Sequence, residues 1–334
     1  NDSTLCNVVG IRLPIHNMTG TLPSTLSNLT LLRSLELGRN RISGTLPDSL
    51  GSLSRMVTLD LRNNDFFALL PSWFSNLTSL RVLNVSHNLF YSSIPESLYS
   101  MQWLELLDIS ENTIEGSLSP NISNMIGLRT LNLGNNVMTG TLPPELAALT
   151  NLTRLNLDSA LMGIYGEFPY WLCNMTQLQV LRLGWNGFGT QVPSQFGQLT
   201  NLTVLALNDN FFSESIPASI LGLTRLEQLE LQNNIFYNSI PAELGNMTNM
   251  TRLNLAGNAF QYALPCDALQ RMKKLSFLSL RKNILTGKVE SCFKGLYHLF
   301  FLSVSNNFLS GHLPDEQWNH MINFIASRNM FSGS

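Results

Sequence analysis

The chain repeats one pattern of apolar and polar positions along almost its whole length. Two apolar residues flank one variable residue, and an asparagine follows three positions after the second of them. An apolar residue comes two positions after the asparagine and a proline seven positions after it, so LRSLELGRNRISGTLP, MVTLDLRNNDFFALLP and LRTLNLGNNVMTGTLP align without gaps. Because most copies recur every 24 residues, the pattern predicts a repeat protein.

The position of the recurring asparagine, here called the asparagine column, gives the number of copies. His16 fills the column in the first copy, where Ile11, Leu13 and Met18 keep the frame, and Ala160 fills it in the seventh. The chain therefore holds fourteen copies, the last one incomplete. An asparagine amide carries two donor hydrogens and an acceptor, so we expect it to satisfy buried backbone groups in the turn after each strand. The column asparagines are Asn40, Asn64, Asn88, Asn112, Asn136, Asn186, Asn210, Asn234, Asn258, Asn283, Asn307 and Asn329.

The period also predicts how the copies pack. One unit of about 24 residues cannot bury its own apolar stripe, so successive units must stack. In each short strand the two apolar residues point inward and the residue between them points outward. We therefore expect parallel strands, about 4.8 Å apart, that line one face of the molecule.

These repeats resemble the leucine-rich repeat family in its plant-type form, which the stretch NRISGTLPDSLGSL matches almost residue for residue. The resemblance implies an α/β solenoid: a right-handed, curved superhelix with a parallel β-sheet on the concave face and mostly 3-10 or irregular convex segments. It also implies a second short strand on one flank, formed by the Thr/Ser-Gly-x-Leu-Pro part of each repeat. Residues 1–334 would form a single solenoid, with residues 1–10 as the remnant of an N-terminal cap and residues 11–334 as repeats. Since the chain opens inside a cap and stops inside a repeat, we expect a fragment of a longer chain or an end covered by another molecule.

Six repeats carry phenylalanine two places after the column asparagine, and none of the six keeps the glycine two places later. Phe331 of the incomplete last repeat is an exception, because Gly333 follows it. One interpretation is a stacked phenylalanine column in the core that tolerates a bulkier flank. The other is a distinct lateral contact surface, because exposed aromatic residues can mark a binding site. The six are Phe66, Phe90, Phe188, Phe212, Phe236 and Phe260, and the aromatic residues expected on the flank are Phe67, Tyr91, Phe211, Tyr237 and Tyr262.

Repeat seven breaks the frame twice. It has Ala160 in place of the asparagine and two extra residues before Gly166. The insertion is either a neutral loop or a bulge at which a partner docks, because insertions in repeat proteins often fall on a binding face.

The outward strand positions are the ones that a partner would touch. Tryptophan and arginine are the residue types that anchor interfaces, and both occur in the middle of the chain. Any solvated face also carries charges, so these residues define a candidate surface only. The candidates are Arg154, Asp158, Arg182, Trp185, Glu230 and Arg252.

Eleven Asn-x-Ser/Thr triplets indicate a secreted chain with covalent N-glycans. Some of these triplets arise from the repeat consensus itself, because Asn-Leu-Thr fits that consensus. Most lie after the proline, on the expected convex side. Asn84 differs, because it falls on an outward strand position, where a glycan would push any concave partner towards the C-terminal half. The triplets begin at Asn1, Asn17, Asn28, Asn76, Asn84, Asn121, Asn151, Asn174, Asn201, Asn246 and Asn249.

The four cysteines have different expected roles. Cys266 and Cys292 are 26 residues apart where the local period is 25, so they occupy nearly equivalent positions in adjacent repeats and a disulfide is predicted. Cys173 takes a column held elsewhere by serine or glycine, which predicts a buried thiol. Cys6 lies in what resembles the tail of an N-terminal cap, without the partner cysteine that such caps usually have.

Composition removes several classes of function. Charged residues make up 13% of the chain and the net charge is −2, so no basic patch supports a nucleic-acid partner. No apolar run reaches the roughly 18 residues of a membrane span, and no signal peptide starts the chain. The five histidines are scattered and the acidic residues are spread along the repeats, so we expect no enzyme, no metal and no cofactor.

These features favour an extracellular recognition module, a portion of a receptor-like or surface protein. The resemblance implies a protein, peptide or glycan ligand bound by the concave or lateral surface. The alternative is a structural or adhesive glycoprotein that self-associates end to end through uncapped solenoid ends. A third interpretation is an inhibitor of a secreted hydrolase, which would bind its partner through the same surfaces as the recognition module.

Overall fold

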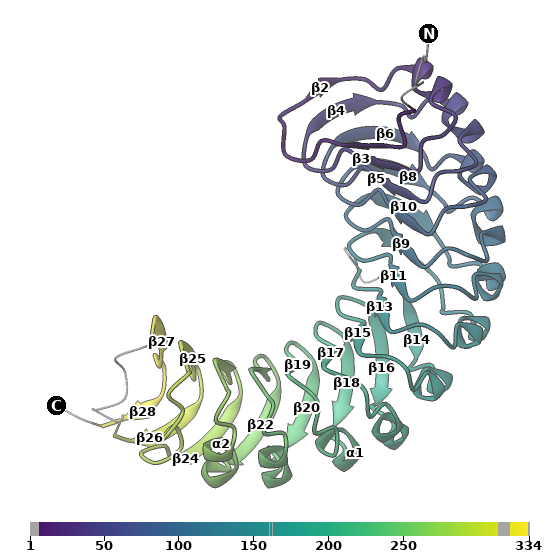
Figure 1. The fold of residues 1–334 in the computed structure, drawn as a ribbon. Coiled ribbons are helices and arrows are strands. Elements are labelled where there is room, and N and C mark those ends of the chain that lie inside the picture. The colour runs from purple at the N-terminus through teal and green to yellow at the C-terminus, as the bar shows by residue number, and fades with distance from the viewer. Residues whose placement is uncertain (1–6, 160, 162, 313–320, 333–334) are drawn as a thin grey trace. The chain divides into compact units, whose positions relative to one another are not determined.

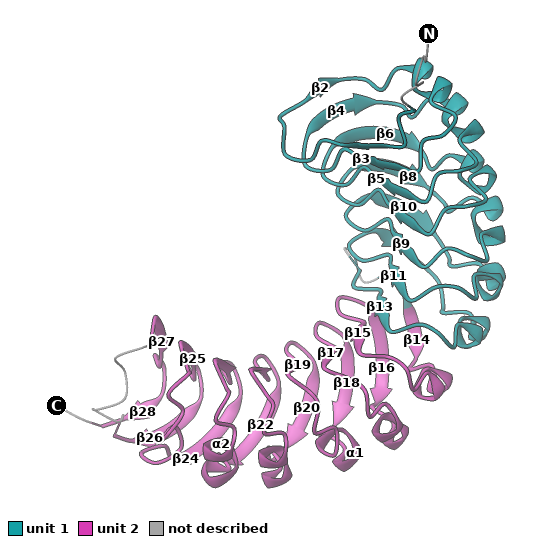
Figure 2. Cartoon of the chain, viewed as in Figure 1, with its two compact units in different colours: residues 1–164 teal, residues 165–334 magenta. Residues whose placement is uncertain are grey.

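The chain folds into two compact units, residues 1–164 and residues 165–334 (Figure 2). The computed structural model describes residues 7–159, 161, 163–312 and 321–332 of the 334 residues. The boundary between the units comes just after the frame break of repeat seven, and Ala160, like Asn1 and Cys6, lies outside the described residues.

Fourteen short parallel strands form the main sheet, seven from each unit. Their central leucines face each other in register, for example Leu35 with Leu59 and Leu205 with Leu229, and these leucines are buried. The strands of the first unit are β1 (Gly10–Arg12), β3 (Ser34–Glu36), β5 (Thr58–Asp60), β7 (Val82–Asn84), β9 (Leu106–Asp108), β11 (Thr130–Asn132) and β13 (Arg154–Asn156). Those of the second are β15 (Val180–Arg182), β17 (Val204–Ala206), β19 (Gln228–Glu230), β21 (Arg252–Asn254), β23 (Phe277–Ser279), β25 (Phe301–Ser303) and β27 (Asn323–Ile325).

A second strand follows the column asparagine and forms a flank sheet in each unit. The plant-type resemblance implies such a strand, but it lies earlier in the repeat than expected: β4, for example, ends at Gly44, before the Leu-Pro pair. The six-stranded flank sheet of the first unit contains β2 (Thr19–Gly20), β4 (Arg41–Gly44), β6 (Asp65–Leu69), β8 (Leu89–Ser92), β10 (Thr113–Gly116) and β12 (Val137–Met138). The eight-stranded flank sheet of the second contains β14 (Tyr165–Glu167), β16 (Gly187–Gln191), β18 (Phe211–Glu214), β20 (Ile235–Asn238), β22 (Ala259–Ala263), β24 (Ile284–Lys288), β26 (Phe308–Gly311) and β28 (Met330–Phe331).

Short helices lie on the side of each unit opposite the main strands (Figure 1). Most begin directly after the repeat proline, whose ring fixes an extended φ near −65° at the N-cap. The 3-10 helices are η1 (Ser24–Asn28), η2 (Asp48–Ser52), η3 (Ser72–Asn76), η4 (Glu96–Ser100), η5 (Pro120–Asn124), η6 (Pro144–Ala148), η7 (Tyr170–Asn174), η8 (Ser194–Gln198) and η9 (Ala242–Asn246). Two short α-helices, α1 (Ala218–Leu221) and α2 (Cys266–Arg271), take the same place in their repeats.

The column asparagines form a hydrogen-bonded ladder, most of it buried. In Asn210 the side-chain Oδ1 accepts from the backbone N–H of Phe188 at 3.1 Å, and Nδ2 donates to the carbonyls of Leu183 and Leu207 at 2.8 and 3.2 Å. Equivalent bonds recur along the described chain, for example at Asn64 and Asn307. The ladder thus satisfies turn groups that burial would otherwise leave without a partner.

The backbone is left-handed at two fixed places in the repeat. The residue before the ladder asparagine has a positive φ, such as 50° at His87 and 56° at Trp185. The fourth residue after it also has a positive φ, and this is the place of the repeat glycine, such as Gly116. The phenylalanine repeats put other residues there, including Thr190 at 111° and Tyr262 at 69°, although only glycine adopts this region without a steric cost.

The phenylalanine column forms part of the core, as the first interpretation of those repeats predicts. Phe66, Phe90, Phe188, Phe212, Phe236 and Phe260 are at most 1% exposed. In the second unit, the ring centroids of Phe188, Phe212, Phe236 and Phe260 follow each other at 6.4, 6.5 and 6.2 Å.

The structure contains a disulfide between Cys266 and Cys292, whose Cα atoms are 4.0 Å apart. It ties the start of α2 to the corresponding segment of the next repeat. Cys173 is a buried free thiol, and its burial raises the pKa of the thiol to about 11. A thiol held in the protonated form in this way is a packing group rather than a nucleophile.

Candidate binding surfaces

In the first unit, two of the predicted concave residues lie at and just after β13. Arg154 opens the strand and is exposed. Asp158 is half-buried, and its backbone N–H donates to the side chain of Asn156 at 3.0 Å while its carbonyl accepts from the N–H of Asn135 at 2.6 Å. Arg154 therefore lies on the strand and Asp158 in the hydrogen-bonded turn that follows it.

In the second unit, Arg182 and Trp185 belong to the same repeat. Arg182 ends β15 and is half-buried. Trp185 stands directly before the ladder residue Asn186, and its side chain is 48% exposed. Its backbone N–H donates to the carbonyl of Asn208 at 2.9 Å, and its φ is 56°. The left-handed turn therefore holds a large aromatic side chain at a fixed, solvent-exposed place.

Glu230 and Arg252 contact each other, which their sequence positions alone did not reveal. Arg252 Nε lies 3.0 Å from a Glu230 carboxylate oxygen, and its guanidinium stacks 3.7 Å from the ring centre of Phe277. The ring of Phe277 stacks in turn on Phe301 at 4.3 Å. The charges of Glu230 and Arg252 thus neutralise each other above the stacked rings of Phe277 and Phe301.

The register of the main sheet brings Arg182 opposite Ala206, and Ala206 opposite Glu230. Ala206 is fully buried. Arg182 and Glu230 are therefore two strands apart, about 10 Å at the usual strand spacing, on either side of a position with a small side chain.

Asn84 lies where the sequence places it, at the end of β7. It is 8% exposed, and its Oδ1 accepts from the backbone N–H and the hydroxyl of Ser86 at 3.1 and 2.7 Å. Its burial disfavours a glycan in the folded chain, and the glycan on Asn84 stays a prediction.

Most other triplet asparagines lie at the surface, several of them at the ends of 3-10 helices. Asn201 and Asn249 are half-buried, and each donates an Nδ2 hydrogen to a carbonyl of the preceding repeat at 2.9 Å. The exposed ones in the described chain are Asn17, Asn28, Asn76, Asn121, Asn151, Asn174 and Asn246.

The described residues contain no group of three or more His, Cys, Asp or Glu side chains that could hold a metal ion. In the same part of the chain, no helix is both long and apolar enough to span a membrane.

Family profiles described as leucine rich repeat match residues 31–53, 54–114, 127–149 and 176–236, together about half of the chain. No match is found among the curated proteins.

Solved structures match over nearly the whole length. A TDR receptor has 27% sequence identity and a TM-score of 0.84, with 97% of this chain and 60% of that chain covered. The leucine-rich-repeat ectodomain of the receptor kinase GASSHO1/SCHENGEN3 from Arabidopsis thaliana, solved with CASPARIAN STRIP INTEGRITY FACTOR 2, has 30% identity and a TM-score of 0.65 over 95% of this chain and 44% of that one.

The Arabidopsis receptor kinase HAESA ectodomain, in complex with an IDA peptide hormone ligand, has 29% identity and a TM-score of 0.67 over 94% of this chain and 64% of that chain. This chain therefore spans between 44% and 64% of the length of the three receptor chains. With the repeat period, the ladder and the two kinds of sheet, these matches show that the chain belongs to the leucine-rich repeat family and that its repeats are of the plant type.

Proposed function

We propose that this chain is a non-catalytic extracellular recognition module that binds a peptide or protein partner on its concave strand surface. The GASSHO1/SCHENGEN3 and HAESA ectodomains were solved with such partners, and this supports the same kind of ligand here. The exposed triplet asparagines support an extracellular location, because N-glycans are added to chains that enter the secretory route.

The observation that carries the proposal is the exposed indole of Trp185. Tryptophan is enriched among the residues that contribute most to binding, and this one is 48% exposed. It occupies a left-handed position that Asn63, Asn135 and Asn233 fill in other repeats, and asparagine tolerates that conformation far better than a large aromatic residue does. Arg39, Glu111 and Lys282 take the same backbone position in other repeats, so the argument for a contact rests on the size and exposure of the indole.

The asparagines at this place in other repeats suggest the variant to test. Trp185→Asn removes the indole and installs the residue type that the fold already uses at this place. Peptides selected from a phage-displayed dodecapeptide library against the glycosylated chain serve as probes. We expect Trp185→Asn to weaken their binding at least tenfold, while the matched variant His87→Asn, at the same place in the first unit, leaves binding unchanged. Unchanged binding by Trp185→Asn, or a selection that enriches no peptide, would contradict the proposal.

Arg182 is the second residue to test on this surface. Its guanidinium is a common anchor at interfaces, and it belongs to the same repeat as Trp185. Arg182→Ala should weaken binding of the same peptides. Arg252→Ala should mainly lower stability, because its guanidinium pairs with Glu230 and stacks on Phe277.

End-to-end self-association is the competing function. Negative-stain images and size-exclusion chromatography of the glycosylated chain distinguish the two, because a recognition module gives discrete particles. Regular fibres would replace the recognition proposal with an adhesive one.

A further inference from the structure

The flank sheet of the first unit exposes a block of large apolar side chains, here called the flank patch: Phe67, Leu69, Leu89 and Tyr91. They are 49%, 56%, 56% and 49% exposed. Phe67 lies opposite Leu89 and Leu69 opposite Tyr91 in the register of β6 and β8. The four side chains thus point from the same face of two adjacent strands.

The neighbouring strands do not continue the flank patch. The outward positions of β4 are Arg41 and Ser43, and those of β10 are Thr113 and Glu115. Strand alternation on a solvated sheet normally places polar residues outward. In the flank sheet of the first unit, the large exposed apolar residues gather on β6 and β8, whereas in the second unit they are spread singly over most flank strands. A polar rim around an apolar centre is the composition of a contact site.

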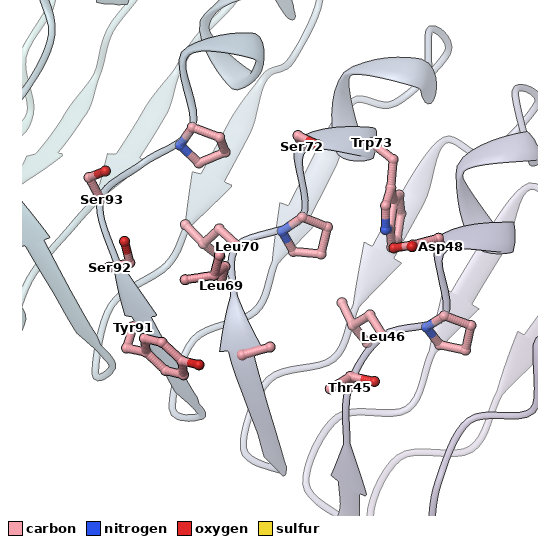
Figure 3. A pocket seen from close by; sticks show the side chains of 14 residues that line it. Thr45, Leu46, Asp48, Leu69, Leu70, Ser72, Trp73, Tyr91, Ser92 and Ser93 are labelled. Carbon is pink, nitrogen blue, oxygen red and sulfur yellow. The ribbon is translucent and has the colours of Figure 1, made fainter.

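A cavity of about 630 Å³ adjoins the flank patch and shares Leu69 and Tyr91 with it (Figure 3). Aliphatic walls from Leu46, Pro47 and Pro71 give it an apolar lining. Asp48 is exposed at one end and is the only carboxylate, and the only residue charged at neutral pH, among the 14 residues that line it. The cavity therefore favours a cationic tip on an apolar stem over any anion.

Trp73 forms the wall beside Asp48 (Figure 3). It is 9% exposed, and its indole nitrogen has no hydrogen-bond partner within the described structure. A buried donor without an acceptor costs about 1–3 kcal/mol.

The size of the flank patch distinguishes a peptide from a second copy of the chain. Four side chains of roughly 200 Å² each, exposed by about half, present about 400 Å². A stable protein–protein interface needs about 800 Å² from each partner, so the patch with its cavity matches a short extended segment. None of these residues belongs to an Asn-x-Ser/Thr triplet, so no glycan is attached within the site.

We propose that the flank patch and its cavity form a second binding site, separate from the concave surface, for a short peptide segment in which an apolar residue adjoins a lysine or arginine. The apolar side chain packs on the flank patch. The basic side chain lays its methylene stem along the cavity walls and places its charge at Asp48. Lysine and arginine suit this arrangement because their stems bury against apolar surface while the charge stays at the rim.

The test uses capped octapeptides with a central Leu-Lys or Phe-Arg pair, and matched peptides in which glutamate replaces the basic residue. Affinity is measured by fluorescence anisotropy on the glycosylated chain. We expect the basic peptides to bind at least tenfold tighter than the glutamate peptides. Leu89→Ser and Asp48→Asn should each weaken the basic peptides about tenfold. Asp48→Asn should also remove most of the preference over glutamate.

The second unit offers a matched control. Ile235 takes the same place in its repeat as Leu89 and is 52% exposed, but it is outside the flank patch, so Ile235→Ser should leave binding unchanged. Equal affinity for basic and acidic peptides, equal loss in both serine variants, or no binding at all would overturn the proposal. Sedimentation that shows a dimer abolished by Leu89→Ser would replace the peptide by a second copy. Trp185→Asn should not affect these peptides, so failure here is distinguishable from failure of the concave site.

Discussion

Asn88→Ala should be among the most destabilising single changes in the first unit. Asn88 is 6% exposed. Its Oδ1 accepts from the Phe66 N–H at 3.1 Å, and Nδ2 donates to the Leu61 and Val85 carbonyls at 3.1 and 3.0 Å. Alanine removes the partner of these three buried backbone groups, each worth about 1–3 kcal/mol when left unsatisfied. Since water and small shifts recover part of this, we expect a loss of about 3–6 kcal/mol in the free energy of unfolding.

Asn40 provides the internal comparison. It makes the equivalent bonds, at 3.0 Å from the N–H of Met18 and 2.8 Å to the carbonyls of Leu13 and Leu37. Asn40 and Met18 are half-buried and Leu13 is exposed, so of these partners only Leu37 is buried. Water can replace most of these bonds, so Asn40→Ala should cost about 1 kcal/mol.

The measurement is guanidinium or thermal unfolding followed by circular dichroism. At about 2–4 °C per kcal/mol for a unit of this size, Asn88→Ala should lower Tm by about 10 °C and Asn40→Ala by about 3 °C. Equal small losses in the two variants would refute the reasoning, because burial of the ladder would then contribute nothing.

Three further predictions concern other parts of the fold. Thr190→Gly should raise the stability of the fold by about 0.5–1 kcal/mol, because glycine adopts a φ of 111° without a steric cost. Gln191→Gly, in ordinary strand geometry, should lower the stability. A loss of stability in both variants would show that Thr190 is not strained. Burial raises the pKa of Asp60, so the stability linked to its proton is present below the unfolded-state pKa and is lost as the pH rises through the folded-state pKa. Asp60→Asn should therefore be more stable than the parent at pH 7 and equally stable at pH 3. An equal gain in stability at both pH values would reject this reasoning. Glycopeptide mass spectrometry should find Asn76 modified and Asn84 unmodified, and a glycan on Asn84 would show that burial does not protect it.

The sequence was sufficient for the architecture because the period is a global constraint. Each L-x-L segment became a main strand, and the residue two places after the ladder asparagine became core, as at Phe212 and Phe236. The same position recurs in every repeat, mostly with the same burial, so one ambiguous residue does not change the interpretation of that position.

The candidate surfaces were harder to predict, because exposure depends on neighbours in the next repeat. Arg252 was expected to face a partner, but it pairs with Glu230 and covers Phe277. Asn84 occupies an outward position and is nevertheless buried. The contacts of Arg252 join residues about one period apart, whereas those of Asn84 are local. A strand pattern specifies the side of the sheet but not which side chains meet on it.

The flank was only half predicted. Phe67 and Tyr91 were identified from their aromatic character, but Leu69 and Leu89 were not. The missed signal was available in the alternation along the flank strands, where two outward leucines replace the polar residues of β4 and β10.

The ladder bonds also give the solenoid a direction of assembly. The side chain of Asn64 accepts from the N–H of Ile42, 22 residues earlier, and donates to the carbonyl of Leu37, 27 residues earlier. The turn of each repeat is therefore completed by a residue of the repeat that follows it. A chain emerging from the ribosome starts with its N-terminal part, so each repeat would close only once the next has been synthesised. Folding would then follow translation with a constant lag of about one repeat.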